Sequence, residues 1–273
     1  MQTWLFVPGN QPERIRKACA TQADRIIIDW EDSVAAEHKA NARQATAEAL
    51  SAEVLCGNAA VHSRIVIRIN PAGSHEHGRD IDAAARIRPA AVMLARTEHP
   101  EMTIALSEHG LDCIALIESA LGVEQAFSIA SMPGVEGLAF GCVDYLADIQ
   151  ARHSLTALHF AQSRLVNAAR AAGLQHIIDG PVIDLSTPEK LATEALHAQA
   201  LGFSGKMAIH PQQVLQMRQL FQASDAELAH AREIIRVYEQ GLRQGQGVIR
   251  HGDLMIDGAV AKQAQWILEA AAQ

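Results

Sequence analysis

The stretch "RIIIDWEDSV", residues 25–34, joins an uninterrupted apolar segment to a group of acids. Its three consecutive isoleucines are β-branched and favour a strand that is buried on both faces, because a strand with one solvated face alternates apolar and polar side chains. Asp29, Glu31 and Asp32 follow within four positions. Carboxylates this close repel one another, so the strand end is either solvated or faces a metal ion or a cationic group.

Similar apolar runs recur along the whole chain and alternate with Ala-rich helical segments. Together with the first, they occupy residues 3–8, 25–30, 64–70, 91–96, 113–118, 137–144, 176–184 and 205–210. The helix expected at 187–202 shows the typical signals, with Thr187 as N-cap, Pro188 next and Gly202 at its end. Eight strand–helix units predict a (β/α)8 TIM barrel, with a doubly wound open sheet as the alternative. No GxGxxG follows the first strand to support that alternative.

The expected barrel takes up most of the chain. It should span residues 1–222, and residues 223–273 should add a long helix and a C-terminal lid segment to the same domain. A length of 273 residues is common for a barrel that forms one domain, and the 49% hydrophobic content supplies an ample core.

Charge, cysteine usage and hydropathy bound the class of protein. The net charge of −8 and the lack of a basic stretch argue against general nucleic-acid binding. Cys19, Cys56, Cys113 and Cys142 form no CxxC pair, which suggests reduced thiols in a cytoplasmic protein. No apolar run reaches the roughly 20 residues of a membrane span, and the first residues do not resemble a signal peptide.

Polar side chains follow several of the expected strands. They are Asp29, Glu31, Asp32, Arg68, Asn70, Arg96, Glu118, Asp144 and His210. Because the carboxyl ends of barrel strands share one mouth, where active sites lie, these side chains should converge there. Arg68 and Arg96 are expected to meet the acids that follow the second strand.

Glu118 and Asp144 form the best candidate metal pair. Each is expected to close an apolar strand, and the two strands are consecutive, so the carboxylates should be neighbours. Mg2+ prefers one or two carboxylates with waters and substrate oxygens. The alternative is that each acid caps the helix that follows it, since anions favour helix N-termini.

Three other polar groups have ordinary interpretations. The segment "SHEHGRD", residues 74–80, is not an HExxH motif and suggests a solvated loop. His210 is expected to be structural or to touch substrate. Asp179 and Asp184 flank Gly180-Pro181, where a turn is the default expectation.

Seven motifs in order carry a resemblance to a known family. They are "LFVPGNQPER" (5–14), "IIIDWEDSV" (26–34), "VIRIN" (66–70), "ALIESALGV" (115–123), "LAFGCVDY" (138–145), "GKMAIHPQQV" (205–214) and "MIDGAVAKQAQ" (255–265). From about Thr3 to Ile267, the chain resembles the citrate lyase beta-subunit-like branch of the HpcH/HpaI aldolase family. The resemblance implies a barrel of the pyruvate/phosphoenolpyruvate type.

The resemblance also implies a chemistry and a set of site residues. Members of the family cleave or form a carbon–carbon bond next to a thioester, with Mg2+ on the residues matched by Glu118 and Asp144. Arg68 would hold the keto-acid carboxylate and the developing oxyanion, and Glu31 and Asp32 would join it in the catalytic group. Asp257 would be an acid–base group supplied by a neighbouring subunit, which implies a homo-oligomer, most simply a trimer.

Further cations match the nucleotide-binding part of the family pattern. Arg14, Lys39 and Arg43 resemble residues that meet CoA. Arg96 follows Ala95 where the family often has Pro-Lys, and a planar guanidinium does not replace an ammonium group one for one. Trp30 stands where the family tends to have Leu, and it either packs behind the barrel or shapes the pocket.

The sequence therefore predicts a Mg2+-dependent lyase that acts on a CoA thioester. The favoured reactions are cleavage of (3S)-citramalyl-CoA to acetyl-CoA and pyruvate, or cleavage of malyl-CoA. The alternatives are a citrate lyase beta subunit that acts on a citryl thioester of an acyl-carrier protein, a malate or citramalate synthase-like activity, and a non-catalytic scaffold. The intact residues Glu118, Asp144, Arg68 and Asp257 argue against the scaffold.

Overall fold

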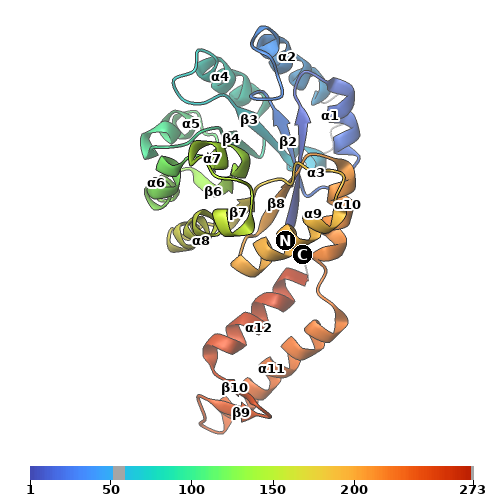
Figure 1. Ribbon diagram of the computed structural model, residues 1–273, viewed down its shortest axis with the longest axis vertical. Coiled ribbons are helices and arrows are strands. Elements are labelled where there is room, and N and C mark those ends of the chain that lie inside the picture. The colour runs from blue at the N-terminus through green and yellow to red at the C-terminus, as the bar shows by residue number, and fades with distance from the viewer. Residues whose placement is uncertain (52–58, 272–273) are drawn as a thin grey trace. The chain divides into compact units, whose positions relative to one another are not determined.

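Eight parallel strands form a closed barrel in the computed structural model, which describes residues 1–51 and 59–271 (Figure 1). The strands are β1 (Gln2–Pro8), β2 (Arg25–Asp29), β3 (Ile65–Ile69), β4 (Ala91–Leu94), β5 (Cys113–Ile117), β6 (Val135–Phe140), β7 (His176–Asp179) and β8 (Gly205–Ala208). Each pairs with its neighbours in chain order, and β1 also pairs with β8, which closes the barrel. The TIM-barrel prediction is confirmed.

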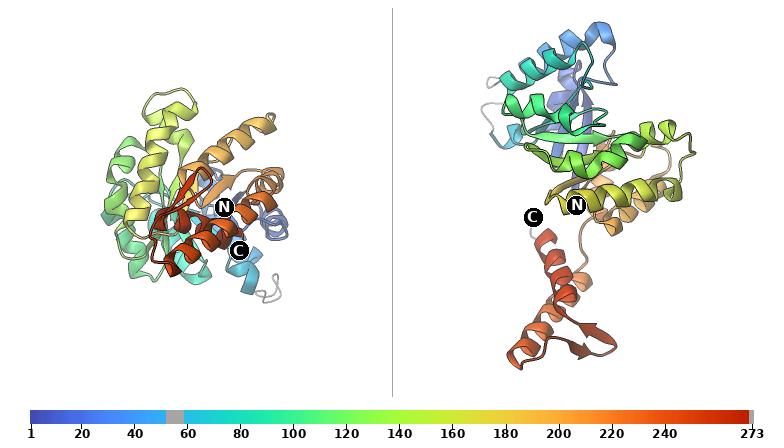
Figure 2. Two further views of the ribbon diagram at one scale, coloured as in Figure 1. Left: turned by 90° about the horizontal axis from the view of Figure 1, so that it is seen from below. Right: turned by 90° about the vertical axis from the view of Figure 1, so that its left-hand side faces the viewer.

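Helices surround the barrel and connect its strands (Figures 1 and 2). They are α1 (Pro12–Cys19), α2 (Lys39–Ala49), α3 (Ala59–His62), α4 (His77–Ile87), α5 (Ile104–Glu108), α6 (Ala120–Ala130), α7 (Cys142–Asp148), α8 (Leu155–Ala171), α9 (Pro188–Leu201) and α10 (Pro211–Leu220), with 3-10 turns at Ala36–His38 and Pro100–Thr103. In α9, Pro188 is the first residue and Gly202 ends the helix in the left-handed region at φ 99°. Thr187 precedes it without a side-chain capping bond.

The barrel interior explains why the strand sequences are apolar throughout. Inward-facing residues such as Ile27, Val66, Met93 and Met207 form one buried cluster, against which the half-buried Phe6 packs. The intervening strand residues face the helices and are buried there, as Ile26 and Ile28 are. Both faces of each strand are therefore removed from water, as in other parallel sheets covered by helices.

Two strands are shorter than the sequence suggests. β6 ends at Phe140 and β7 at Asp179, whereas the apolar runs continue to residues 144 and 184. After β6 the chain turns at Gly141 directly into α7. Apolar residues in a first helical turn look like a continued strand in the sequence, so the expected boundaries were wrong here.

The chain divides into two compact units, Met1–Leu220 and Phe221–Gln273. In the second unit, α11 (Asp225–Arg243) is followed by a hairpin of β9 (Ile249–His251) and β10 (Leu254–Ile256) and then by α12 (Gly258–Ala271). Ser224 and Glu227 form a capping box at the start of α11. A small apolar core joins α11, the hairpin and α12; its buried members are Ala231, Ile234, Val237, Ile256 and Ala264.

No helix in the described part of the chain is long and apolar enough to span a membrane. Of the four cysteines, Cys19, Cys113 and Cys142 are free thiols, and Cys56 lies outside the described residues.

Candidate active site

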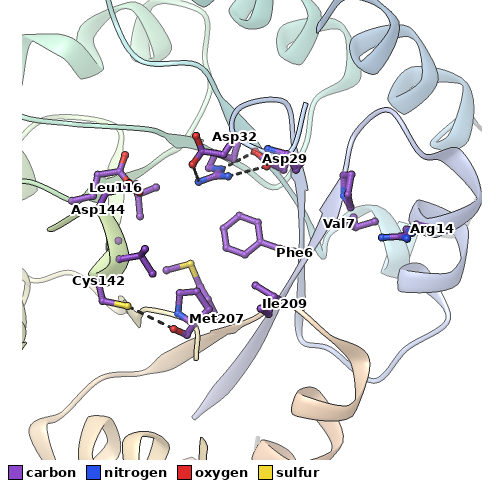
Figure 3. A pocket seen from close by; sticks show the side chains of 17 residues that line it. Phe6, Val7, Arg14, Asp29, Asp32, Leu116, Cys142, Asp144, Met207 and Ile209 are labelled. Carbon is purple, nitrogen blue, oxygen red and sulfur yellow. Dashed lines mark hydrogen bonds and ion pairs between the residues drawn. The ribbon is translucent and has the colours of Figure 1, made fainter. Parts of the chain in front are cut away.

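A cavity of about 480 Å³ is lined by residues from the carboxyl ends of the barrel strands and from the loops that follow them (Figure 3). Its charged lining residues are Arg14, Asp29, Asp32, Arg68, Glu118 and Asp144. Phe6 and Met207 project into it from the barrel interior (Figure 3). Of the side chains expected to converge, Asp29, Asp32, Arg68, Glu118 and Asp144 line this cavity, whereas Glu31, Asn70, Arg96 and His210 do not.

Arg68 binds the acids that follow β2. Asp29 ends β2 and pairs in register with Arg68 on β3. The guanidinium donates from Nε to Oδ1 of Asp29 at 2.7 Å and from Nη2 to Oδ2 at 2.8 Å. Its third arm, Nη1, lies 3.4 Å from Asp32 Oδ2 and 3.2 Å from Glu31 Oε2. A strand that ends in three acids is thus tolerated because the neighbouring strand supplies the cation.

The pKa values of Asp29 and Glu31, two of the acids around Arg68, shift in opposite directions. Burial disfavours the charged form of Asp29, but the hydrogen bonds and charge of Arg68 outweigh burial and lower the pKa of this carboxyl. Burial raises the pKa of Glu31 to about 7, with repulsion from Asp32 and Asp29 adding to the rise and Arg68 opposing it. The buried Oε2 of Glu31 lies near Arg68 but accepts no hydrogen bond among the described residues.

Glu118 lies at the end of β5, 5% exposed, and its Oε1 accepts a hydrogen bond of 2.7 Å from the backbone N–H of Arg96. Gly141 leaves room for it, because a Cβ there would lie 2.5 Å from Glu118 Oε2. Burial raises the pKa of Glu118 to about 8, and the charges of Asp144 and Glu31 contribute to this rise against the Arg96 N–H and the charge of Arg68.

Asp144 lies in the first turn of α7, four residues beyond the end of β6. The expectation that it closes a strand was wrong, but the helix still directs it into the cavity that Glu118 lines. Its carboxylate makes no hydrogen bond with the part of the chain that the structure describes, and α7 has no side-chain cap. The first-turn position fits the helix-terminus alternative, and the exposed carboxylate also lines the cavity with Glu118, so the structure is compatible with both interpretations.

The donor set at Glu118 and Asp144 fits a magnesium ion. Among the described residues, no group of three or more His, Cys, Asp or Glu side chains is arranged to enclose a metal. Mg2+ does not require one, because it keeps several waters and uses one or two carboxylates together with substrate oxygens. Burial is the main cause of the raised pKa of Glu118, and a divalent ion bound beside this carboxyl would favour its charged form.

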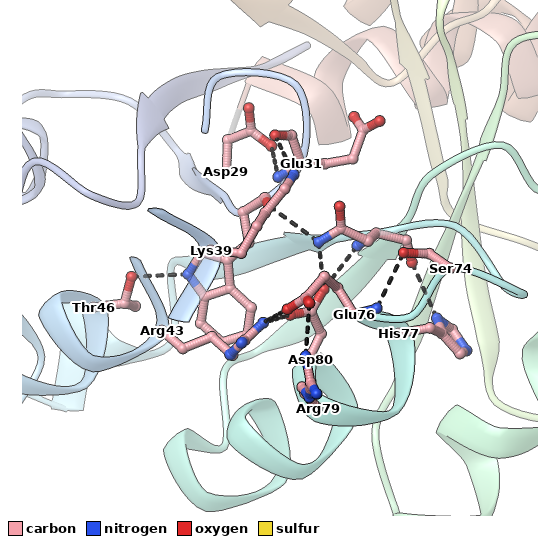
Figure 4. A network of polar contacts seen from close by, with 12 residues as sticks. Asp29, Glu31, Lys39, Arg43, Thr46, Ser74, Glu76, His77, Arg79 and Asp80 are labelled. Atoms are coloured by element: carbon pink, nitrogen blue, oxygen red, sulfur yellow. Dashed lines mark hydrogen bonds and ion pairs between the residues drawn. The ribbon is translucent and has the colours of Figure 1, made fainter. Parts of the chain in front are cut away.

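The predicted CoA-binding cations are placed differently from one another. Arg14, on α1, is exposed and lines the cavity. Lys39 is 9% exposed, and its Nζ donates to the backbone carbonyls of Trp30 at 2.9 Å and Glu31 at 2.7 Å (Figure 4). Arg43 binds Glu76 and Asp80, each at 2.7 Å. Neither Lys39 nor Arg43 lines the cavity, and both are already engaged within the protein.

Lys39 and Arg43 belong to a network of buried polar contacts next to the segment that carries Asp29 and Glu31 (Figure 4). Asp80 accepts hydrogen bonds from the backbone and the side chain of Asn70, whose amide also donates to the carbonyl of Trp30. The sequence did not reveal this role for Asp80. The "SHEHGRD" segment is not a simple solvated loop, because Glu76 pairs with Arg43 and Arg79.

Arg96 acts through its backbone. Its side chain is exposed and forms no ion pair within residues 1–51 and 59–271, so the expectation that it meets the acids was wrong. Its backbone is in the left-handed region at φ 49°, an uncommon conformation for a residue with a Cβ. That turn aims the Arg96 N–H at Glu118.

Three further residues have structural roles. Trp30 is fully buried and donates from Nε1 to Thr46 Oγ1 at 2.9 Å, so it packs behind the barrel. His210 Nδ1 accepts from the N–H of Gln212 at the start of α10. Asp179 is more than a turn residue, because it forms a buried ion pair with Lys206.

Asp257 lies in the second unit and caps α12. Its Oδ1 accepts hydrogen bonds of 2.9 Å from the N–H groups of Ala259 and Val260. The cap interpretation of this residue is therefore observed. Its Oδ2 makes no hydrogen bond with the described residues, so one oxygen is not used by the cap.

The chain is similar to proteins of known activity along its whole length. The HpcH/HpaI aldolase/citrate lyase family matches residues 2–211, and a family of C–C bond lyases of the TIM-barrel fold matches residues 154–270. Citrate lyase subunit beta of Escherichia coli is 29% identical, with 99% of this chain and 93% of that protein covered. The mitochondrial citramalyl-CoA lyase of Rattus norvegicus is 29% identical over 97% of this chain and 84% of that protein.

A bacterial malyl-CoA lyase and a solved structure extend the set. L-malyl-CoA/beta-methylmalyl-CoA lyase of Rhodobacter capsulatus is 29% identical over 98% of this chain and 93% of that protein. The crystal structure of protein CitE from Mycobacterium tuberculosis in complex with magnesium, acetoacetate and coenzyme A superimposes with a TM-score of 0.86 at 31% identity. It covers 100% of this chain and 98% of its own.

Proposed function

Because the chain belongs to the HpcH/HpaI aldolase/citrate lyase family, whose named relatives are carbon–carbon lyases, we propose that it is a Mg2+-dependent lyase of β-hydroxyacyl-CoA thioesters. The observation that carries the proposal is the pair Glu118 and Asp144 in one cavity with Arg68. Magnesium and coenzyme A occur together in the solved M. tuberculosis relative. The favoured reaction is cleavage of (3S)-citramalyl-CoA to acetyl-CoA and pyruvate.

Glu118 and Asp144 would hold the ion. Mg2+, when bound, would neutralise charge on the substrate's hydroxyl and carboxylate oxygens and favour loss of the hydroxyl proton. Arg68 would stabilise negative charge as it develops, but its Nε and Nη2 are occupied by Asp29. Its Nη1 makes only the longer contacts, with Asp32 at 3.4 Å and Glu31 at 3.2 Å, so this arm would bind a substrate oxygen in place of the full guanidinium fork that the sequence suggested.

The acids around Arg68 supply a group that can exchange a proton near neutral pH. Glu31 has a pKa of about 7, and efficient general acid–base groups have pKa values close to the working pH. Asp32 lines the cavity beside it. Phe6, Leu116 and Met207 form an apolar floor that limits the water around the developing enolate.

The charge of the cavity supports a keto acid with an apolar substituent. Among the described residues, Arg14 and Arg68 are the cations that line it, and Arg68 already faces three carboxylates. Citryl-CoA carries a carboxymethyl group where citramalyl-CoA carries a methyl group, and the additional carboxylate would require a cation if it were buried. Malyl-CoA lacks that methyl group, a difference worth about 1–3 kcal/mol in an apolar pocket.

The second candidate function is that of a citrate lyase beta subunit, which the similarity to the E. coli protein supports. Purified protein would be assayed with Mg2+ and with citramalyl-CoA, malyl-CoA and citryl-CoA, and the released keto acid would be measured. We expect pyruvate release from citramalyl-CoA that EDTA abolishes. Turnover of a citryl thioester only when it is carried by an acyl-carrier protein would contradict the CoA proposal and support the second candidate.

Arg14 is the residue best placed to meet the CoA nucleotide, because it is exposed at the cavity while Lys39 and Arg43 are engaged elsewhere. The described cysteines are free thiols, which supports work in a reducing compartment such as the cytoplasm.

A homo-oligomer, most simply a trimer, completes the proposal, with Asp257 of one subunit protonating the enolate carbon in the site of another. The hydrogen bonds of Asp257 support this role. Its Oδ1 caps α12, and its Oδ2 makes no hydrogen bond with the described residues, so Oδ2 is available to carry a proton. Burial of the carboxyl in a closed site would raise its pKa enough for it to act as an acid.

Mixing two inactive variants, Asp257→Ala and Glu118→Ala, tests this arrangement. Mixed oligomers should regain activity, because some sites would combine an intact metal pair with an intact Asp257. Subunit exchange would be checked with labelled protein. Exchange without recovered activity would show that Asp257 does not act across subunits.

A further inference from the structure

Four buried polar side chains form a cluster outside the barrel interior, beside β7 and β8. They are Lys206, Asp179, Gln162 and Gln213, each no more than 5% exposed. Lys206 is adjacent in β8 to Met207, which belongs to the interior cluster, and alternate strand residues face opposite sides. Lys206 therefore points away from the cavity, and none of the four side chains lines it.

The cluster binds two backbone carbonyls of the segment after β7, and Cys142 contacts the carbonyl between them. Lys206 Nζ donates to Asp179 Oδ2 and, at 2.8 Å, to the carbonyl of Gly180. Gln213 Nε2 donates to the carbonyl of Val182 at 2.7 Å, and Cys142 Sγ lies 3.6 Å from the carbonyl of Pro181. Each carbonyl of residues 180–182, the segment that follows β7, is thus contacted by a side chain from a different element.

Two anchors extend this arrangement. Gln162, on α8, donates to the remaining oxygen of Asp179 at 2.9 Å, which completes the pairing of that carboxylate. Gln213 also accepts, through Oε1, a hydrogen bond of 2.8 Å from the N–H of Ile209. A single glutamine therefore joins the segment after β7 to the segment after β8.

The segments held in this way form part of the cavity wall. Pro181 and Ile209 line the cavity, and so does Cys142, the first residue of α7. Gly180 packs tightly against that residue, because a Cβ at Gly180 would lie 2.4 Å from Cys142 Sγ. The segment that the cluster binds therefore contacts the start of α7, whose first turn carries Asp144.

Burial of an ammonium group is unfavourable even when it is paired, and replacing a whole buried ion pair with apolar residues is often as stable. The Lys206–Asp179 pair thus adds little net stability, whereas the directional bonds of Lys206 to a carbonyl and a carboxylate fix a local geometry. Groups that orient a ligand from behind typically change metal affinity when they are lost.

We propose that Lys206 and Gln213 are positioning residues for the candidate active site. They hold residues 180–182 as one wall of the cavity and, through Gly180 and Cys142, fix the start of α7 so that Asp144 faces Glu118. That the bound ion is Mg2+ rests on the proposed function. That residues 180–182 fix the position of α7, which we call the bracing of α7, rests on the contacts alone.

Gln213→Leu tests the proposal without leaving a buried charge unpaired. Gln216→Leu is its matched control, because Gln216 lies on the same helix and also donates to a backbone carbonyl, that of Pro188, but at a half-buried position that does not line the cavity. Mg2+ titration of the substrate-free protein should show about tenfold weaker binding in Gln213→Leu and no change in Gln216→Leu. Lys206→Met should weaken it further, to about 100-fold, if that variant folds.

Amide hydrogen exchange gives a readout that does not depend on the reaction. In Gln213→Leu, peptides that cover residues 176–187 and 142–148 should exchange faster, while β3 should be unchanged. If wild-type protein binds no Mg2+ and cleaves no thioester, the proposed function fails, and exchange in residues 142–148 alone decides the bracing of α7.

Three results would overturn the proposal. One is a folded Gln213→Leu variant with wild-type Mg2+ affinity and exchange. Another is an equal loss of affinity in Gln216→Leu. The third is faster exchange after β7 with unchanged Mg2+ affinity in a protein whose wild type binds the ion, because the cluster would then serve only the fold.

Discussion

Two groups of carboxylates line the same cavity, and only one of them has its own cation. Asp29 and its neighbours Glu31 and Asp32 surround Arg68, which donates two hydrogen bonds to Asp29 and a longer one to Asp32 and also pairs with Glu31. Glu118 receives one backbone N–H, and Asp144 receives no hydrogen bond from the described residues. The first group is compensated within the fold, and the second is not.

The pKa values follow this difference. Arg68 overcomes the effect of burial and lowers the pKa of Asp29, whereas burial with little compensation raises the pKa of Glu118 to about 8. A compensated carboxylate keeps its charge and its position before any ligand arrives. An uncompensated pair in the same cavity is suited to receive a divalent ion, since such an ion supplies the missing charge.

Glu118→Gln should have the largest effect, because it removes charge from the group that needs an external cation. Bound Mg2+ supplies several kcal/mol of charge stabilisation, so activity should fall by about 10³-fold or more. Thioester cleavage and Mg2+ titration would measure the loss. Asp148→Asn is the control, because Asp148 is an exposed carboxylate on α7 that accepts a hydrogen bond from the backbone N–H of Ala120 and does not line the cavity.

Near-normal Mg2+-dependent turnover in Glu118→Gln would contradict the metal assignment. It would also remove the contrast between the two carboxylate groups, because Glu118 would then be an uncompensated acid without a ligand.

Arg68→Lys should have the next largest effect, because it keeps the charge of the compensated group but removes the fork that binds Asp29. An ammonium group cannot make the paired bonds of 2.7 and 2.8 Å and also face the substrate, so activity should fall by about 10²-fold. Initial rates and thermal unfolding would be measured together.

Arg64→Lys is the control, because it also replaces a guanidinium group with an ammonium group but at a residue outside the cavity. Arg64 immediately precedes β3, at the other end of the strand from Arg68, and donates to the carbonyls of Ala23 and Thr21. The Arg64→Lys variant should lose stability but keep its activity. Equal loss of activity in both variants would show that Arg68 acts only through the fold.

The smallest expected effect is a pH dependence of stability from Glu31, the least compensated acid of the first group. Its pKa is about 7 in the folded protein and 4.5 in the reference state, so the folded state binds more protons between these values. The stability that Glu31 contributes is fully present below about pH 4.5 and is lost as the pH rises through about 7.

Thermal unfolding of metal-free protein between pH 4.5 and 8 would measure this effect, at roughly 2–4 °C for each kcal/mol lost. Glu31→Gln should flatten the decrease relative to wild type. An identical pH profile in the variant would mean that Glu31 is ionised throughout the range and that Arg68 compensates all three acids.

The sequence predicted the barrel well, because uninterrupted apolar strands and capped helices are local patterns. It also predicted that Glu118, Asp144 and Arg68 share a mouth, since the topology of a barrel brings strand ends together. It did not distinguish compensated from uncompensated acids, because the partner of Asp29 comes from the next strand and its pairing depends on register. Asp144 was misplaced because the first turn of α7 continues the apolar pattern of β6.

The buried cations could not be assigned from the sequence. Lys39 on α2 and Lys206 on β8 bind backbone carbonyls inside the protein, although lysine is usually exposed. Nothing in their local sequence separates them from solvated lysines, because burial is decided by which helix face or strand face packs inward. Asp179 could not be assigned either. The Gly180-Pro181 turn signal after it would be the same whether its carboxylate faced water or, as observed, Lys206.

The closure of the barrel between β1 and β8 also bears on synthesis in the cell. Residues Gln2–Leu5 pair with Gly205–Ala208, so the second edge of β1 has no partner until about 200 residues have been translated. At roughly 5–20 residues per second, that edge stays open for about 10–40 s, and an open strand edge invites pairing with other chains. Met207, part of the cavity floor, arrives with β8, so the cavity is completed in the same step that pairs the open edge of β1.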